Sequence, residues 1–206
     1  ALLNQHPEIF HSVAFVGVPF AGGVGFLPDL HAGEAVGLNR KILSPKVLFR
    51  FPSVYTLFPL SGAGLIEPDG KPIEMDFFSA AQWKEKKLSV FSGESTAEQL
   101  SFLGGALAKA RAFRVLLAAK KQSYPPILVV SGREYPTLVT AIRNGPKSVG
   151  GWDLESAPKV PGDGRVAERD SHPPEGVPYR QIYSKKEHTD QLSDPEVVRE
   201  IKAQLE

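Results

Sequence analysis

Two runs of apolar residues without alternation constrain the fold of this chain most strongly. They cover residues 13–18 and residues 125–132. A strand that is apolar on both faces is typical of a parallel sheet whose two faces are both covered. Residues 178–184 are predicted to form a third strand, because Tyr179, Ile182 and Tyr183 favour β-structure. The sequence therefore predicts an α/β fold with a parallel sheet of about three strands.

Two helices are predicted from their starting signals. Thr96 and Gln99 have the spacing of a capping box, and the apolar residues that follow recur every three or four positions. The second helix begins after Asp194, whose side chain can cap it, and Pro195 suits the first helical position. These signals place one helix before the second apolar run and another at the end of the chain.

The stretch between residues 24 and 95 lacks this alternation of strands and helices. It holds scattered apolar and aromatic residues, and six prolines divide it into short pieces. We predict that residues 24–121 form an inserted cap or lid, while residues 1–23 and 122–206 form the core. The aromatic residues of the cap are predicted to fill its own interior. The charged run WKEKK at residues 83–87 is predicted to be a solvated face.

Composition excludes several classes of site. The 24 basic and 23 acidic residues leave a net charge of +1, which argues against nucleic acid or another polyanion as the main partner. The chain has no cysteine, so disulfides, thiolate metal sites and a cysteine nucleophile are excluded. No segment has the unbroken apolar length that is needed to span a bilayer.

One short loop stands out as a candidate functional element. Residues 161–166 (PGDGRV) place Asp163 between two glycines, in a turn that presents the carboxylate. His188 follows the third predicted strand. This is the order of the acid and the base in a Ser…Asp…His triad of an α/β-hydrolase. Spacing alone favours the plainer interpretation, which is a surface turn and an exposed loop histidine.

Other residues could fill the same roles less well. His172 precedes the third strand and so fits the order of a triad poorly. Asp170 and Asp190 are alternative acids, but each lies too near a histidine in the sequence to match the strand-separated arrangement. The remaining histidines are predicted to be loop or surface residues: His6, His11 and His31.

Four segments resemble the lecithin:cholesterol acyltransferase family. Residues 17–23 (GVPFAGG) resemble its Gly-Thr-Pro-Phe/Trp-x-Gly turn, and residues 52–59 (PSVYTLFP) resemble the Pro-Ser-x-Tyr-x-Leu-Leu-Pro motif of its cap. Residues 162–166 resemble its Gly-Asp-Gly-Thr-Val turn. His188, followed by a short acidic loop and a terminal helix, is similar to its triad histidine. The chain departs from these patterns at Val18 and Arg165, and neither departure removes a triad side chain.

The resemblance implies a partial α/β-hydrolase fold and a serine hydrolase that works as a lipid O-acyltransferase or lipase. Asp163 would be the triad acid and His188 the base. The substrates would be a lipid acyl ester and an alcohol or water as acceptor, met at a membrane or lipoprotein surface. Such an enzyme needs no metal or organic cofactor. A plain carboxylesterase or triacylglycerol lipase remains an alternative.

The nucleophilic serine that the resemblance implies is not found in residues 1–206. The family carries it in a Gly-x-Ser-x-Gly elbow, and no such elbow occurs here. By order it would lie just upstream of Ala1, and residues 1–5 are predicted to end the helix that follows it. We therefore expect a fragment that has the acid and the base, is inactive alone, and needs the N-terminal part of the same protein. The alternative is a non-catalytic interaction module derived from a hydrolase.

Overall fold

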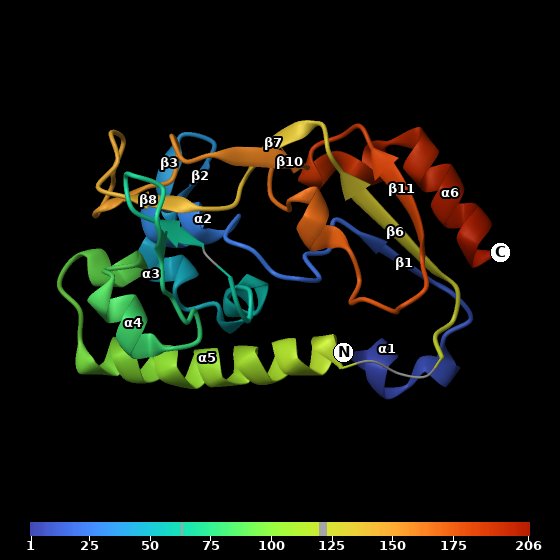
Figure 1. Ribbon diagram of the computed structural model, residues 1–206, viewed down its shortest axis with the longest axis horizontal. Helices are drawn as coiled ribbons and strands as arrows, with labels where there is room; N and C mark the ends of the chain where they lie inside the picture. Colours follow the sequence, from blue (N-terminus) through green and yellow to red (C-terminus); the bar gives the residue numbers. More distant parts are fainter. Residues whose placement is uncertain (63, 120–122) are drawn as a thin grey trace. The chain divides into compact units, whose positions relative to one another are not determined.

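The computed structural model describes residues 1–62, 64–119 and 123–206, and it contains both helices and sheets (Figure 1). The chain divides into two compact units. Unit 1 comprises Ala1–Ala21, Val115–Leu138 and Lys159–Glu206, and unit 2 comprises Gly22–Arg114 and Val139–Pro158. The predicted division differs from these units chiefly in assigning Val139–Pro158 to the core.

Unit 1 is built on a parallel sheet of three strands, with β6 between β1 and β11 (Figure 1). The strands are β1 (Val13–Val16), β6 (Ile127–Gly132) and β11 (Arg180–Ser184). Val13 pairs with Ile127, and Arg180 pairs with Leu128, both in parallel register. The predicted parallel sheet is therefore confirmed. Its three carboxyl ends meet at one edge, which is where ligands bind in open α/β sheets.

Helix α6 (Pro195–Leu205) packs on one face of this sheet. Asp194 caps it, since its Oδ1 accepts a hydrogen bond from the backbone N–H of Glu196 at 3.1 Å. Val197 is fully buried in a cluster with Leu128 and Val130. The predicted terminal helix is thus confirmed. The remaining elements of unit 1 are α1 (Leu2–Gln5), η1 (Pro7–Ile9), β7 (Tyr135–Leu138), β10 (Lys159–Gly162), η4 (Glu168–Ser171) and η5 (His188–Ser193).

Unit 2 consists of short elements, and helix α5 (Ala97–Ala118) begins in it and ends in unit 1. The predicted capping box at the start of α5 is confirmed: Gln99 Oε1 accepts from Thr96 N at 2.8 Å, and Thr96 Oγ1 accepts from Gln99 N at 3.2 Å. The other elements are α2 (Leu27–Ala32), β2 (Glu34–Val36), β3 (Asn39–Leu43), α3 (Pro45–Leu48), η2 (Pro52–Leu57), β4 (Leu65–Ile66), β5 (Pro72–Ile73), α4 (Ala80–Glu85), η3 (Ser89–Ser92), β8 (Ala141–Arg143) and β9 (Trp152–Asp153).

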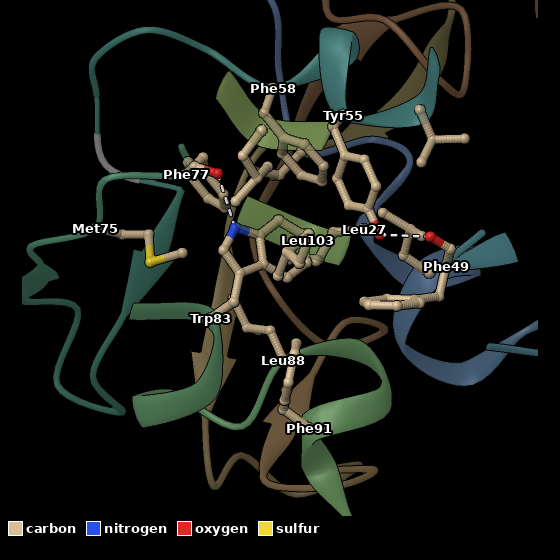
Figure 2. Close-up of a cluster of buried hydrophobic side chains, with 14 of the residues drawn as sticks. Leu27, Phe49, Tyr55, Phe58, Met75, Phe77, Trp83, Leu88, Phe91 and Leu103 are labelled. Atoms are coloured by element: carbon tan, nitrogen blue, oxygen red, sulfur yellow. Dashed lines mark hydrogen bonds between the residues drawn. The ribbon is translucent and has the colours of Figure 1, made fainter. Parts of the chain in front are cut away.

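The core of unit 2 is an aromatic cluster around Trp83 (Figure 2). The indole lies edge-on to Tyr55 and Phe58, at centroid distances of 5.8 and 5.2 Å. Its Nε1–H donates to the carbonyl of Phe77 at 2.7 Å, so the polar end of the ring is satisfied. The prediction that the aromatic residues of this region form its interior is confirmed for Phe49, Tyr55 and Phe58, but it is wrong for Phe51, which is exposed.

The prediction that residues 83–87 form a solvated face is wrong at its first residue. Trp83 is fully buried, whereas Lys84 and Glu85 are exposed. All three belong to α4, where neighbouring residues point about 100° apart, so one turn can bury an indole and expose the charges beside it.

The prediction of a surface position for His31 is also wrong. Its side chain is 3 % exposed in α2. Nε2 lies 2.6 Å from the carbonyl of Val149, and Nδ1 accepts from the backbone N–H of Ser89 at 3.0 Å. A carbonyl can only accept, so Nε2 carries the proton and the ring is neutral. Burial lowers the pKa of His31, and the hydrogen bond to Val149 opposes this only in part.

This burial predicts that unit 2 loses stability in mild acid. Because the folded pKa of His31 lies below the ordinary 6.5, the unfolded chain takes up the proton first as the pH falls. The contribution of His31 is complete above pH 6.5. Below it, the free energy of unfolding should fall by at most about 1.4 kcal/mol per pH unit.

Urea unfolding at pH 7.5 and 5.5 measures this loss, and both tryptophans of the chain, Trp83 and Trp152, report on unit 2. The control is His31→Gln, which cannot take up a proton and should lose less stability between the two pH values. An equal loss in both chains would show that another group is responsible.

Candidate functional site

The structure brings Asp163 and His188 together at the carboxyl edge of the parallel sheet. Asp163 directly follows β10, and His188 opens η5, shortly after the end of β11. His188 Nδ1 lies 2.9 Å from Asp163 Oδ2, although the two residues are 25 positions apart. The backbone N–H of His188 also donates to the carbonyl of Asp163 at 2.9 Å. The two segments are therefore joined through both backbone and side chain.

The carboxylate of Asp163 is buried, with 1 % of its surface exposed, and it accepts hydrogen bonds at both oxygens. Oδ1 accepts from the backbone N–H groups of Arg165 and Val166 at 2.9 and 2.7 Å. Oδ2 accepts from Gln191 Nε2 at 2.9 Å, in addition to His188. Burial by itself raises the pKa of Asp163, but the hydrogen bonds from His188, Val166 and Arg165 outweigh it, so the pKa lies below its ordinary value.

Two glycines at strand ends make room for this pair. A Cβ on Gly132, the last residue of β6, would lie 2.5 Å from Asp163 Cβ. Gly17 follows β1 with φ +61°, and a Cβ there would lie 3.0 Å from both Cε1 and Nδ1 of His188. Glycine at these positions therefore lets the strand ends approach the two side chains directly.

A buried chain of hydroxyl groups connects the sheet to the segment behind Asp163. Gln181 Nε2 donates to Ser131 Oγ at 2.9 Å, and Ser171 Oγ donates to the carbonyl of Glu168 at 2.6 Å. The 2.6 Å bond between the two serines must then run from Ser131 to Ser171. This network ties β6 and β11 to η4.

His188 is arranged to act as a base. Since Asp163 is ionised and can only accept, Nδ1 carries the proton and Nε2 of the neutral ring keeps its lone pair. Within the part of the chain that the structure describes, Nε2 has no hydrogen-bond partner, and the side chain is 35 % exposed. The ring can therefore take up a proton at Nε2 while Asp163 holds its orientation.

The rival residues are placed differently. His172 Nδ1 is hydrogen-bonded to the hydroxyl of Tyr179 at 2.9 Å. Among the described residues, the carboxylate that pairs with His188 is that of Asp163, and not that of Asp170 or Asp190. Gln191, which the sequence analysis did not single out, is 1 % exposed and completes the shell of Asp163. Only its position three residues after His188 could have indicated this role, because a 3₁₀ helix places residues i and i+3 on the same face.

Gly22 and Gly23, the last two residues of the segment 17–23, contact the other family-like segment within unit 2. The N–H of Gly23 donates to the carbonyl of Leu57 at 2.8 Å. Gly22 has φ +77°, and a Cβ there would lie 2.7 Å from the carbonyl oxygen of Phe58. These two glycines thus support residues 52–59.

No known protein-family model and no curated protein matches this sequence significantly. In the described residues, no cluster of three or more His, Cys, Asp or Glu side chains is arranged to hold a metal ion. No helix within those residues has the length and apolar character to cross a membrane.

The contact between Gly17 and His188 gives a direct test of the site. Gly17→Ala should destabilise the chain by about 1 kcal/mol through its left-handed backbone, and should also displace the imidazole. Gly37→Ala is the matched control, because Gly37 has φ +59° with nothing within 4 Å of a Cβ. The signal of the His188 Nδ1 proton in NMR spectra should change only in Gly17→Ala. An unchanged signal in that variant would contradict this geometry.

Proposed function

We propose that Asp163 and His188 are the acid and the base of a Ser-His-Asp triad in a lipid acyltransferase or lipase. The observation that carries this proposal is the 2.9 Å bond from His188 Nδ1 to the buried Asp163, with Nε2 left without a partner in the described residues. The order of acid and base and the four family-like segments support it further.

The reaction would proceed by acyl transfer through the enzyme. A serine Oγ attacks the ester carbonyl as Nε2 of His188 takes its proton, and the carbon–oxygen bond to the leaving alcohol breaks as Nε2 returns that proton. Asp163 holds the tautomer and stabilises the imidazolium. Water or an alcohol then attacks the carbonyl of the acyl-enzyme as Nε2 of His188 takes its proton. The bond between the acyl carbon and the serine Oγ breaks as Nε2 passes this proton to Oγ, which releases the product and restores the serine.

The serine of this proposal lies outside residues 1–206. Ser131 stands at the end of β6 but is 1 % exposed and bonded to Gln181 and Ser171, so its hydroxyl is unsuited to attack a substrate. We propose that a Gly-x-Ser-x-Gly turn in the N-terminal part of the same protein supplies the nucleophile. The three-stranded sheet would then be the C-terminal part of an α/β-hydrolase fold, with unit 2 as its cap.

A lipid surface is the proposed place of action, and the β2–β3 hairpin supports it. Val36, Leu38 and Ile42 are 45, 106 and 51 % exposed there, next to the cationic Lys41. Exposed apolar side chains beside a positive charge are typical of segments that contact membrane interfaces. The aromatic residues clustered around Trp83 offer no such support, since they fill the interior of unit 2 (Figure 2).

The 206-residue chain alone should neither hydrolyse a p-nitrophenyl ester nor form an adduct with a serine-directed phosphonate. Mass spectrometry of the phosphonate-treated chain measures the adduct. An adduct on a serine within residues 1–206 would mean that the nucleophile is assigned wrongly.

In the protein with its N-terminal part, His188→Ala should lower ester turnover at least about a thousandfold, because the base is lost. His172→Ala is the matched control, since His172 is also in unit 1 but is bonded to Tyr179. Circular dichroism checks that both variants fold. Turnover that survives His188→Ala would remove His188 from the triad. The absence of any serine elbow upstream would favour a non-catalytic module.

A further inference from the structure

A second group of chemically active residues lies in unit 2 and takes no part in the proposed triad. A pocket of about 450 Å³ opens between the end of α4 and the β8–β9 hairpin. Lys86, Lys87, Arg143, Asn144 and the Gly150–Gly151 turn contribute to its lining. A pocket of this size falls within the range of small-molecule sites.

The charge of the lining is positive. Glu85 is its one acidic residue and pairs with Lys86 at 3.2 Å, while Glu67 pairs with Arg143 at 2.9 Å. Lys87 forms no ion pair with any described residue, so one positive charge is left uncompensated. Arg143 also lies over the ring of Trp152, 5.8 Å from its centroid, which orients its planar guanidinium.

The pocket is also rich in hydrogen-bond donors. Gly150 and Gly151 form a tight turn in which Val149 N donates to Trp152 O at 2.9 Å and Trp152 N donates back at 3.1 Å. The N–H groups of the two glycines have no hydrogen-bond partner in the described chain, and the same is true of the Asn144 side-chain amide. A concentration of donors beside a positive charge suits an oxyanion.

The buried His31 holds this turn in place. It donates to the carbonyl of Val149 at 2.6 Å, and a Cβ on Gly150 would lie 2.9 Å from its Nε2 and 2.7 Å from Ser92 Cβ. The backbone is also strained at this pocket, because Lys87 has a left-handed φ of 54° although it is not a glycine. Strained residues of this kind cluster at functional sites.

We infer that this pocket binds a phosphate group, either as inorganic phosphate or as a phosphate ester. The doubly charged oxyanion would be held by Lys87 and Arg143 and would accept hydrogen bonds from the N–H groups of Gly150 and Gly151. Phosphate suits these groups because Arg forms paired hydrogen bonds with its oxygens, Lys supplies a point charge, and turn N–H groups complete the cradle.

Isothermal titration of the 206-residue chain with inorganic phosphate, at ionic strength held constant with NaCl, tests the inference. Lys87→Asn and Arg143→Gln should each weaken binding about tenfold, the effect of one charged hydrogen bond. Asn is chosen at position 87 because it tolerates a left-handed backbone. Lys84→Gln is the matched control: Lys84 is exposed on α4 and does not line the pocket, so affinity should not change.

Two further binding measurements identify the source of the phosphate. Competition by glycerol 3-phosphate would identify a soluble ester, and capture by phosphatidylcholine vesicles containing phosphatidic acid, lost in Lys87→Asn, would identify a lipid headgroup. The inference is overturned if the folded chain shows no saturable phosphate binding, or if both pocket variants bind as the unchanged chain does. None of these outcomes depends on ester turnover.

Discussion

The buried carboxylate of Asp163 is the constraint on which the arrangement of unit 1 depends. A charge taken out of water is destabilising by several kcal/mol unless it is fully paired. Its partners come from the turn that follows it, from the first residue of η5 and from Gln191 within the same turn of helix. Satisfying one side chain therefore fixes the position of the loop after β10 and of the segment after β11.

Two of the buried ionisable groups of this protein, Asp163 and His31, show how the surroundings decide the charge. Asp163 meets only donors, so its ionised form is favoured in spite of its burial. His31 meets a carbonyl on one side and an N–H on the other, which together suit only the neutral ring. The first group is thereby prepared to stabilise a positive imidazolium. The second serves as a neutral support for the turn at Val149.

Sequence patterns predicted the three strands of the parallel sheet and the two longest helices, and they predicted the pairing of Asp163 with His188 by their order along the chain. They did not predict the short helices and strands of unit 2. β6 was recognisable because it is buried along its whole length, β1 by its apolar run and β11 by its β-forming residues. The two long helices were recognisable because their caps are local. Trp83, His31 and Gln191 could not be assigned in this way. His31, Trp83 and Gln191 contact residues that are far from them in the sequence. The periodicity of a sequence carries no information about such contacts. The pocket in unit 2 could not be predicted either, since its cations come from the residues that follow α4 and from β8.

The two proposed sites divide cleanly between the units. Every donor to Asp163, and both glycines that admit the pair, belong to unit 1. The groups proposed to hold phosphate all belong to unit 2. The orientation of His188 thus follows from contacts made by the parallel sheet and its connections alone. The turn proposed to hold phosphate is likewise supported within unit 2, by the hydrogen bond between His31 and the carbonyl of Val149.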